Sequence, residues 1–372
     1  MNGSIVMALV FGAAALTTAA LTPLVRALSI RFGVYAPTNA RTIHKQPISQ
    51  LGGVAIFGGF VVAMLLSLVL TNVLGWLPRD SFELLRVALL LIGATMLWVV
   101  SLLDDLWDLP ALPRLIWQFI CALVAVGPYL WDHTLYQPDN QARGIIFTAF
   151  NNPLGGGQIN FHDLSPWLAI GVTLFWIAGT TNTLNWIDGL DGLAAGLTLI
   201  SALVLAIHTI TLNQSTIALL PLALAGACLG FLPYNFHPAR IFMGDSGAMT
   251  LGYLLAITAI IGGAKLATAL LVLGIPILDG VWMVFYRRFT GGRSMGADRR
   301  HLHHRLLDLG LSQRQVVLLY YSVSLLFGAI ALLVPDGNRL FKLGALGLLV
   351  LLLAGVLIYV TRRGPRPASA GR

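Results

Sequence analysis

Apolar residues run along this chain in long, nearly uninterrupted stretches that recur from one end to the other. Eleven of these stretches are long enough for a helix to cross a hydrocarbon core of roughly 30 Å. Because backbone groups inside a bilayer must be hydrogen-bonded within the chain, continuous apolar runs predict helices. The predicted spans lie near residues 4–28, 51–75, 83–103, 114–131, 166–182, 192–211, 216–232, 247–262, 267–286, 316–334 and 342–360.

The sequence therefore predicts an all-α, polytopic integral membrane helix bundle with about 11 transmembrane helices. Hydrophobic residues make up 57% of the 372 positions and charged residues only 10%, against about 25% charged residues in soluble domains. We interpret residues 1–360 as one transmembrane domain and 361–372 as a basic tail. The first apolar run lacks preceding basic residues and an evident cleavage site, so we interpret it as a retained helix. Cys121 and Cys228 fall inside apolar runs and indicate neither a disulfide nor a cysteine metal site.

The basic residues predict the orientation of the chain in the membrane. Of the 23 Lys and Arg residues, 17 fall in one set of alternate inter-span segments and 6 in the other. The positive-inside rule places the richer set in the cytosol, so we expect the N-terminus outside, the C-terminus cytosolic and the protein in the inner (cytoplasmic) membrane. The same bias accounts for the net charge of +8, and no nucleic-acid partner is needed to explain it.

Polar motifs gather on the predicted cytosolic side, as a single active site would require. They occupy residues 104–108, 182–192, 233–247 and 287–305. The longest outer segment, 132–165, contains Gly155–Gly157, which we interpret as a flexible loop. No strand or Lys-Ser/Thr pair follows this triplet, so it is not a phosphate-binding loop.

The first motif is an acidic cluster at the end of the third predicted span. Asp104, Asp105 and Asp108 lie close together, and a continuous helix would place Asp104 and Asp108 on one face. Carboxylates this close raise each other's pKa or recruit a cation. A solvated helix end is the simpler alternative, but clustered carboxylates at a membrane boundary favour a functional site.

The second motif combines amides, carboxylates and glycines. An unbroken helix would spread its polar groups around the helix circumference, whereas the glycines permit a tight break that brings them together. A plain turn is the alternative, and the spacing does not fit an EF-hand calcium loop. The motif consists of Asn182, Asn185, Asp188, Gly189, Asp191 and Gly192.

The third motif is Gly-Asp-Ser-Gly at residues 244–247, preceded by Pro233–Phe236. We expect Ser246 to cap the eighth span and Asp245 to lie at the positive end of that helix. Capping alone would explain both residues, although Asp245 could also bind a metal. The serine-protease resemblance of this segment lacks the scaffold and partners that a catalytic triad needs.

The fourth motif is an arginine- and histidine-rich run over residues 299–305. Its flanking arginines would repel zinc but suit phosphate oxygens. Leu302, Leu306 and Leu309 follow helical spacing and predict a short amphipathic helix on the bilayer surface. A basic loop that binds only lipid headgroups is the alternative.

These groups together favour one chemistry. Asp and Asn oxygens suit Mg²⁺ or Mn²⁺, and cationic groups suit a diphosphate. The combination indicates phosphoryl transfer, in which positioning and charge neutralisation supply most of the catalysis. Because the motifs lie at the membrane boundary, we expect one substrate to be a lipid. A secondary transporter is the distant alternative, but it would place its ionisable groups near mid-bilayer.

In their order and identity, the motifs resemble the polyprenyl-phosphate N-acetylhexosamine-1-phosphate transferase family over nearly the whole chain. The run from Ala297 to Leu306 is similar to bacterial undecaprenyl-phosphate GlcNAc-1-phosphate transferases, which start lipopolysaccharide O-antigen, enterobacterial common antigen or wall teichoic acid synthesis. The phospho-MurNAc-pentapeptide transferase branch typically has three histidines followed by Phe-Glu, and a lysine where this chain has Asp108. Both departures argue against that branch.

The resemblance implies UDP-GlcNAc and undecaprenyl phosphate as substrates, UMP as product, Mg²⁺ as cofactor with Mn²⁺ as a substitute, and membrane lipids as surroundings. It implies that Asp245 is the principal metal ligand, with Asn185 nearby, and it suggests a homodimer. Asp104 and Asp105 would act at the acceptor phosphate. The remaining site residues would be Lys45, Asn182, Asp188, Asp191, Asn235, Phe242, His301, His303, His304 and Arg305, of which Asp188 is a further catalytic candidate.

For the reaction, we expect the lipid phosphate to attack the β-phosphorus directly. A double displacement through a phospho-aspartate at Asp104 or Asp105 is the alternative. Another UDP-N-acetylhexosamine, or UDP-MurNAc-pentapeptide, could replace UDP-GlcNAc through small changes in the pocket.

Overall fold

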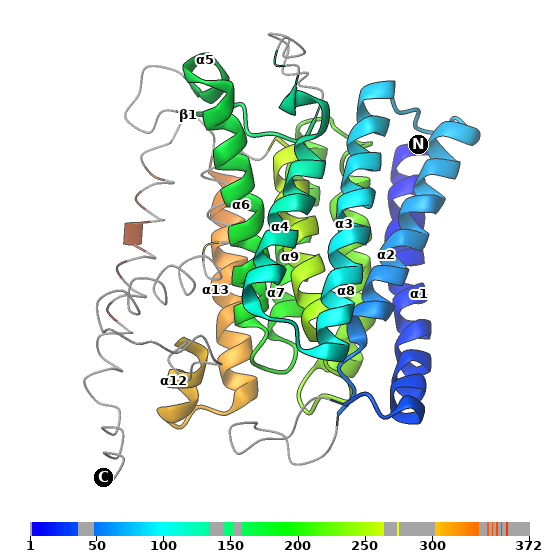
Figure 1. Ribbon diagram of the computed structural model, residues 1–372, viewed down its shortest axis with the longest axis vertical. Coiled ribbons are helices and arrows are strands. Elements are labelled where there is room, and N and C mark those ends of the chain that lie inside the picture. The colour runs from blue at the N-terminus through cyan, green and yellow to red at the C-terminus, as the bar shows by residue number, and fades with distance from the viewer. Residues whose placement is uncertain are drawn as a thin grey trace.

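Long helices running in one common direction form the body of the structure (Figure 1). The computed structural model describes residues 2–35, 48–131, 133, 144–151, 158–263, 274 and 302–334, with isolated positions 341, 344, 347, 348, 351 and 355. The long helices are α1 (Asn2–Phe32), α2 (Gly52–Leu68), α3 (Ser81–Trp107), α4 (Ala111–Val126), α6 (Pro166–Ile187), α7 (Leu193–Thr211), α8 (Leu219–Asn235), α9 (Gly244–Ile261) and α13 (Gln313–Leu333). The shorter elements are η1 (Val69–Val73), η2 (Gly127–Leu130), β1 (Ala149–Asn151), β2 (Gln158–Asn160), α5 (Phe161–Leu164) and α12 (Leu302–Asp308).

The helices confirm that the chain is a multi-pass membrane protein. Eight helical segments within the described residues are long and apolar enough to cross a bilayer. At 1.5 Å per residue, the 22 residues of α6 extend about 33 Å, and the 17 residues of α8 reach somewhat less far. Nine of the predicted spans coincide with described helices. The predicted spans near 267–286 and 342–360 fall almost wholly outside the described residues.

Helix α9 lies at the centre of the bundle and is buried along most of its length. It packs against α3 and α6, and also contacts α2, α7 and α8. Glycines allow these close approaches: a Cβ on Gly252 would lie 2.7 Å from the Cα of Thr181 in α6, and one on Gly53 would lie 2.3 Å from the backbone nitrogen of Gly247. Small residues at such contacts are typical of membrane helix packing. The Gly53 contact fixes the first turn of α9 relative to α2, and the Gly252 contact fixes the middle of α9 relative to α6.

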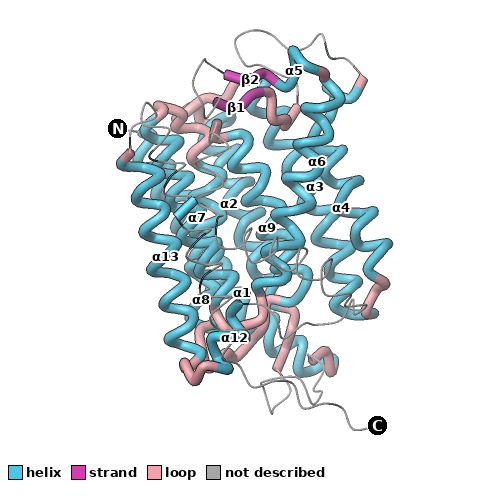
Figure 2. The backbone as a smooth tube through the Cα atoms, turned by 90° about the vertical axis from the view of Figure 1, so that its left-hand side faces the viewer, coloured by secondary structure: helices cyan, strands magenta, loops and turns pink. Residues whose placement is uncertain are grey.

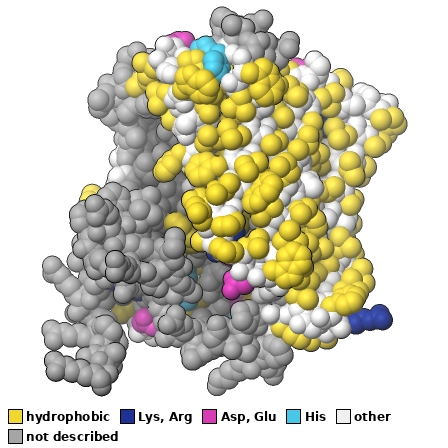
Figure 3. Space-filling model, in the orientation of Figure 1, with side chains coloured by type: hydrophobic (Ala, Val, Ile, Leu, Met, Phe, Trp, Pro, Cys, Tyr) yellow, Lys and Arg dark blue, Asp and Glu magenta, His cyan; other side chains and the backbone are white. Residues whose placement is uncertain are grey.

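Apolar side chains cover most of the face of the described helices that Figure 3 shows. Leu65, Ile92 and Leu318, from three different helices, are each more than half exposed. An apolar surface of this extent would be unusual on a protein surrounded by water. It agrees with a lipid-facing perimeter.

The two ends of the bundle differ in structure. At one end, which we call the acidic end, α3, α6 and α8 finish and α4, α7 and α9 begin. At the other, which we call the hairpin end, β1 and β2 pair antiparallel, with Phe150 opposite Ile159, and α5 follows (Figure 2). Cross-strand pairing orders the residues on either side of the glycine triplet, and the interpretation of the triplet itself as a flexible loop stays a prediction. Gly155–Gly157 lie outside the described residues.

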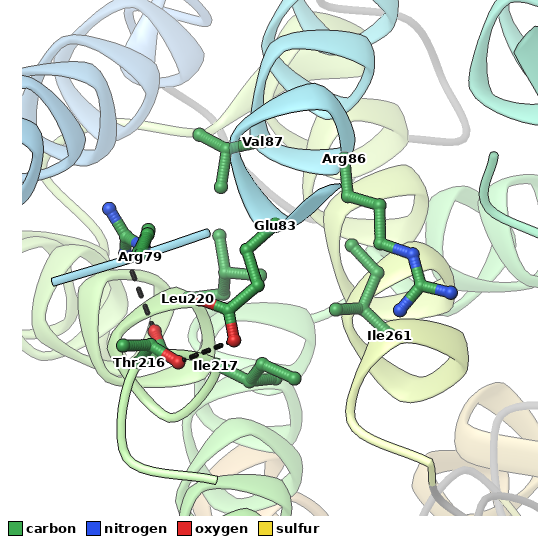
Figure 4. A pocket seen from close by; sticks show the side chains of 8 residues that line it. All are labelled: Arg79, Glu83, Arg86, Val87, Thr216, Ile217, Leu220 and Ile261. Carbon is green, nitrogen blue, oxygen red and sulfur yellow. Dashed lines mark hydrogen bonds between the residues drawn. The ribbon is translucent and has the colours of Figure 1, made fainter. Parts of the chain in front are cut away.

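A buried charged group fastens the hairpin end of α3. Arg79 is 7% exposed and donates to Ser67 Oγ at 3.2 Å and to the Thr216 backbone oxygen at 3.3 Å. Thr216 Oγ1 donates in turn to Glu83 Oε1 at 2.8 Å (Figure 4). Arg79, Glu83, Arg86 and Thr216 are among the residues that line a cavity of about 10 Å³, room for about one water molecule. The cavity is at the far end of α3 from Asp104. The hydrogen bonds beside it hold the α7–α8 connection against α3.

Candidate active site

Asp104 lies in the last turn of α3 and is almost fully buried. Its side chain is 2% exposed, and its Oδ1 accepts a hydrogen bond from the Leu109 backbone N–H at 2.7 Å. The helix ends at Trp107, and Asp108 adopts a left-handed conformation with φ +50°. The prediction that Asp104 and Asp108 share a helical face was therefore wrong. Asp108 is exposed beyond the helix end.

Asp105 joins the end of α3 to the beginning of α9. Its two carboxylate oxygens accept hydrogen bonds from the backbone N–H groups of Asp245 at 2.7 Å and Ser246 at 3.0 Å. The residue preceding the helix is Met243, which has no polar side chain to satisfy the free N–H groups. The prediction that Ser246 caps this helix was therefore wrong, because a carboxylate from α3 supplies the cap.

Gly244 lets the two segments approach closely. It has φ +70°, and a Cβ there would lie 2.7 Å from the Asp105 carboxylate and 2.2 Å from the Gln50 backbone oxygen. Gln50 Nε2 also donates to the Asp105 backbone oxygen at 2.6 Å. The glycine is thus required for conformation and for space, and it places Asp245 at the positive end of α9.

Arg114 of α4 links two carboxylates that are far apart in the sequence. Its Nη1 lies 2.7 Å from Asp104 Oδ2 and 2.8 Å from Asp245 Oδ2. The Asp245 and Arg114 side chains are 33% and 28% exposed, so this ion pair is open to solvent on one side. From the sequence, Arg114 was only one of the 17 basic residues that predicted the orientation. Its position ten residues after an aspartate pair, in the first turn of the next helix, was the available signal.

The end of α6 brings both asparagines to the site on an unbroken helix. Asn185 Nδ2 donates to Asp245 Oδ1 at 2.8 Å. Asn182, one turn earlier, exchanges hydrogen bonds with the Gln118 side chain of α4, whose Nε2 lies 3.2 Å from Asn182 Oδ1. The expected glycine break does occur, but only after Ile187. Gln118 was missed because it lies inside an apolar span.

Asp188 follows α6 directly and is half-buried. Burial raises the pKa of its carboxyl well above the usual value, and the neighbouring carboxylates of Asp245, Asp105 and Asp191 raise the pKa further. Asp188 therefore lies within electrostatic range of the groups at the ends of α3 and α9. The structure brings these three motifs into one acidic cluster, as the sequence predicted.

Asp191 and Asn235 hold the α8–α9 loop against the α6–α7 turn. Asp191 Oδ2 accepts from the Ala239 N–H at 3.0 Å and lies 2.7 Å from His237 Nδ1. Asn235 is 2% exposed; its Oδ1 accepts from the Gly192 N–H at 3.1 Å and its Nδ2 donates to the Ile241 oxygen at 3.0 Å. Both side chains thus position the loop that leads to Phe242.

Phe242 is half-buried in the segment that precedes α9. Its backbone N–H donates to the Ser49 oxygen at 2.8 Å, and its own oxygen accepts from the Gly52 N–H at 2.9 Å. The start of α2 and the start of α9 are therefore joined by backbone hydrogen bonds. Lys45, which the family resemblance implies as a site residue, lies outside the described residues.

The histidine segment reaches the same turn. His303 in α12 is fully buried, and a Cβ on Gly189 would lie 2.6 Å from its Nε2. The His303 and His304 rings are 4.4 Å apart, and Arg305 follows, half-buried. His301 lies outside the described residues. The active-site segments on α6 and α12 therefore meet.

The short helix α12 was predicted correctly, but its expected place on the bilayer surface was wrong. Leu302 and Leu306 are 4% and 6% exposed and belong to the protein core. Leu309, which lies beyond the end of α12, is 41% exposed. The apolar side of α12 thus packs on protein.

The donor chemistry at the acidic end fits a hard divalent cation. Carboxylates of Asp104 and Asp245 and the amide of Asn185 are oxygen-bearing groups of the kind that Mg²⁺ accepts. Among the described residues, no three carboxylate, histidine or cysteine side chains already surround a metal position. Arg114 instead lies between Asp104 and Asp245. The side chains present are of the chemical types that bind Mg²⁺. In this structure the Arg114 guanidinium provides the positive charge between Asp104 and Asp245.

Comparison with known proteins agrees with this site. Residues 87–263 match the model of glycosyl transferase family 4. The chain is 30% identical to the probable undecaprenyl-phosphate N-acetylglucosaminyl 1-phosphate transferase of Bacillus subtilis, over 91% of this chain and 87% of that protein. It is 34% identical to the decaprenyl-phosphate N-acetylglucosaminephosphotransferase of Mycolicibacterium smegmatis, over 98% and 91%.

A phospho-N-acetylmuramoyl-pentapeptide-transferase is also related. The protein of that name from Desulforudis audaxviator is 32% identical, over 86% of this chain and 96% of its own length. The names of the first two relatives specify a polyprenyl phosphate and an N-acetylglucosamine phosphate, and the name of the third specifies a phospho-N-acetylmuramoyl-pentapeptide. With its membrane helices and its acidic cluster, the chain belongs to the polyprenyl-phosphate N-acetylhexosamine-1-phosphate transferases of glycosyl transferase family 4.

Proposed function

We propose that this protein transfers GlcNAc-1-phosphate from UDP-GlcNAc to undecaprenyl phosphate and releases UMP. The reaction would form undecaprenyl-diphospho-GlcNAc, the first membrane intermediate of a cell-envelope polysaccharide. The observation that carries the proposal is the meeting of Asp104, Asp245 and Arg114 at one end of the bundle. Two relatives whose names specify N-acetylglucosamine and a polyprenyl phosphate support the choice of sugar and acceptor.

The acidic end would face the cytosol of a cell whose inner membrane holds the protein. The 17 basic residues of the predicted cytosolic segments, against 6 in the others, support this orientation. A nucleotide sugar would then reach Asp245 from the aqueous side, where its side chain is 33% exposed. The lipid phosphate would reach the same place from the membrane boundary.

In the proposed reaction, an oxygen of the lipid phosphate attacks the β-phosphorus of the donor. The bond from that phosphorus to the oxygen shared with the α-phosphate breaks, and UMP leaves with that oxygen. A phosphomonoester with a second pKa of about 6 is already largely dianionic at neutral pH, so no side chain must remove a proton first. A bound Mg²⁺, held by Asp245 with Asn185 beside it, would neutralise charge on the diphosphate.

The geometry favours direct attack over a phospho-aspartate intermediate. Both carboxylate oxygens of Asp105 accept backbone hydrogen bonds at the start of α9. Asp104 is 2% exposed, with one oxygen on the Leu109 N–H and the other on Arg114. A nucleophile must present a free oxygen to phosphorus, and neither carboxylate does so without breaking these contacts. A burst of UMP in the absence of acceptor lipid would contradict direct attack.

Two alternatives differ from the proposal in substrate or class. The relationship to a phospho-N-acetylmuramoyl-pentapeptide-transferase keeps UDP-MurNAc-pentapeptide, or another UDP-N-acetylhexosamine, as a second donor to test. A secondary transporter would need ionisable groups near mid-membrane. Here Asp104 and Asp245 lie in the last turn of α3 and the first turn of α9, which favours the enzyme.

The decisive experiment is UMP release by the purified full-length protein with a panel of UDP-sugars. We expect release from UDP-GlcNAc that depends on undecaprenyl phosphate and stops when EDTA removes Mg²⁺. Asp245→Ala should abolish turnover, whereas Asp163→Ala, an exposed carboxylate at the hairpin end, should leave it unchanged. Turnover with a different UDP-sugar alone would mean that this sugar is the donor. Sustained release of UMP over many turnovers without acceptor lipid, as opposed to a single burst, would remove the transferase assignment.

A further inference from the structure

One guanidinium nitrogen holds two carboxylates together at the acidic end. Arg114 Nη1 is 2.7 Å from Asp104 Oδ2 and 2.8 Å from Asp245 Oδ2. The other oxygens of these carboxylates also have donors: Asp104 Oδ1 accepts from the Leu109 N–H, and Asp245 Oδ1 accepts from Asn185 Nδ2. The guanidinium therefore occupies the place between Asp104 and Asp245 where a cation is most strongly attracted.

We propose that the Arg114 guanidinium neutralises Asp104 and Asp245 when no metal is bound. The divalent metal then displaces the guanidinium from these two carboxylates. On leaving the carboxylates, the guanidinium binds phosphate oxygens of the bound substrates. This inference rests on the proposed function, because it takes the metal and the phosphates from that reaction. Arg114 thus changes from carboxylate partners to phosphate partners when metal binds, and this competition sets the affinity of the site for the metal.

The positive charges of Arg114 and of the metal prevent both from occupying the position between Asp104 and Asp245 at the same time. A divalent cation on Asp245 Oδ2 would lie within a few ångströms of Arg114 Nη1, and like charges so close repel strongly outside bulk water. With Asp105 beside them, the three carboxylates outnumber the single guanidinium. A divalent cation offsets this excess negative charge better than Arg114 does, so the metal is expected to displace the side chain.

The position of Arg114 allows the exchange. Its side chain is 28% exposed and belongs to the first turn of α4, so it has solvent on one side. Asp104, by contrast, is 2% exposed and fixed by a backbone hydrogen bond. The arginine is thus the mobile partner of the pair. A planar guanidinium matches phosphate oxygens as well as carboxylates, and a diphosphate supplies the acceptors that it needs after leaving Asp245.

The test is Mn²⁺ binding to the purified full-length protein without substrates, measured by electron paramagnetic resonance. Arg114→Gln removes the competing charge and should tighten Mn²⁺ binding by about tenfold. Arg114→Lys keeps the charge and should bind Mn²⁺ about as the wild type does. Arg240→Gln removes an exposed arginine near the same end and controls for the general loss of positive charge.

Activity provides the second measurement. Arg114→Gln should lower kcat/KM for undecaprenyl phosphate and UDP-GlcNAc even at saturating Mg²⁺, because the phosphates lose a ligand. Unchanged or weaker Mn²⁺ binding in Arg114→Gln, with wild-type thermal unfolding, would overturn the inference while leaving the transferase proposal intact. Failure of the substrate-free wild type to bind Mn²⁺ would also overturn the inference, whereas the transferase proposal fails only if UMP release is absent.

Discussion

The carboxylate of Asp105 accepts a hydrogen bond from the backbone N–H of Asp245 at 2.7 Å, across 140 residues of sequence. The second oxygen accepts from the Ser246 N–H, so α3 supplies the cap of α9. The same contact sets the position of the Asp245 side chain, which faces Arg114 and Asn185. Stability of the bundle and geometry of the site therefore depend on one carboxylate.

Removing the Asp105 carboxylate should lower the stability of the bundle and disturb the geometry of the site. We expect Asp105→Ala to lower the free energy of unfolding by about 1–2 kcal/mol, the usual cost of losing an N-cap, and Asp105→Asn to cost less because one oxygen remains. Thermal unfolding in detergent measures the stability. Mn²⁺ titration measures the metal affinity, which depends on the position of Asp245. Asp108→Asn, on an exposed residue beyond the end of α3, is the matched control. Equal stability of Asp105→Ala and wild type would show that the cap contributes nothing.

The helices and the location of the site could be predicted from the sequence because each depends on local pattern. Apolar runs of sufficient length become helices in a bilayer whatever their partners. Polar clusters at 104–108, 182–192 and 244–247 interrupt those runs, which is why they lie together at helix ends. The alternation of the runs across the membrane then places all three clusters at one end.

The contacts within the site depend on helix packing, which a single sequence does not reveal. Arg114 and Gln118 gain their roles only because α4 packs against both α3 and α6. Asp105 caps α9 because α3 and α9 pack against each other. Likewise, Leu302 and Leu306 have the spacing of an amphipathic helix on a membrane surface, but they pack against the protein core.

The paired amides of Gln118 and Asn182 offer a test of that packing. Gln118 is 2% exposed, and the two side chains exchange hydrogen bonds. Gln118→Leu or Asn182→Leu should each cost about 1–3 kcal/mol, because the remaining amide is left buried without its partner. The double variant should cost less than the sum of the two, which a double-mutant cycle of thermal unfolding measures. Strict additivity would mean that the two amides do not stabilise each other.

Gly189 tests whether α12 belongs to the active site. Gly189→Ala would place a Cβ 2.6 Å from His303 Nε2, so the His303 ring, or α12 with it, must shift. A displacement of about 1 Å at a catalytic site can cost on the order of 100-fold in rate, and we expect a loss of this size in UMP release with little change in thermal unfolding.

Gly171→Ala is the matched control for this change. Gly171 lies in α6 with no atom within 4 Å of the added methyl group. Alanine there should preserve activity and raise helix stability slightly. Full activity of Gly189→Ala would mean that the contact between α12 and the α6–α7 turn is dispensable for transfer.

Asp188 should make the stability of the metal-free protein depend on pH. Burial and nearby carboxylates raise its folded-state pKa well above the usual value, which is about 3.9 in an unfolded chain. Neutral Asp188 therefore contributes stability that is fully present below about pH 4 and is lost as pH rises through the raised folded-state pKa. Asp188→Asn stays neutral throughout, so its advantage over the wild type should grow with rising pH.

Thermal unfolding in detergent and EDTA, from about pH 5 to about pH 8, measures this difference, because the range lies above the unfolded-state pKa. The melting temperature of Asp188→Asn should exceed that of the wild type most at the upper end of the range. Asp108→Asn, which changes an exposed carboxyl, is the matched control. A difference for Asp188→Asn that shrinks as pH rises would mean that the folded protein favours the carboxylate, and Asp188 would then have an unrecognised cationic partner.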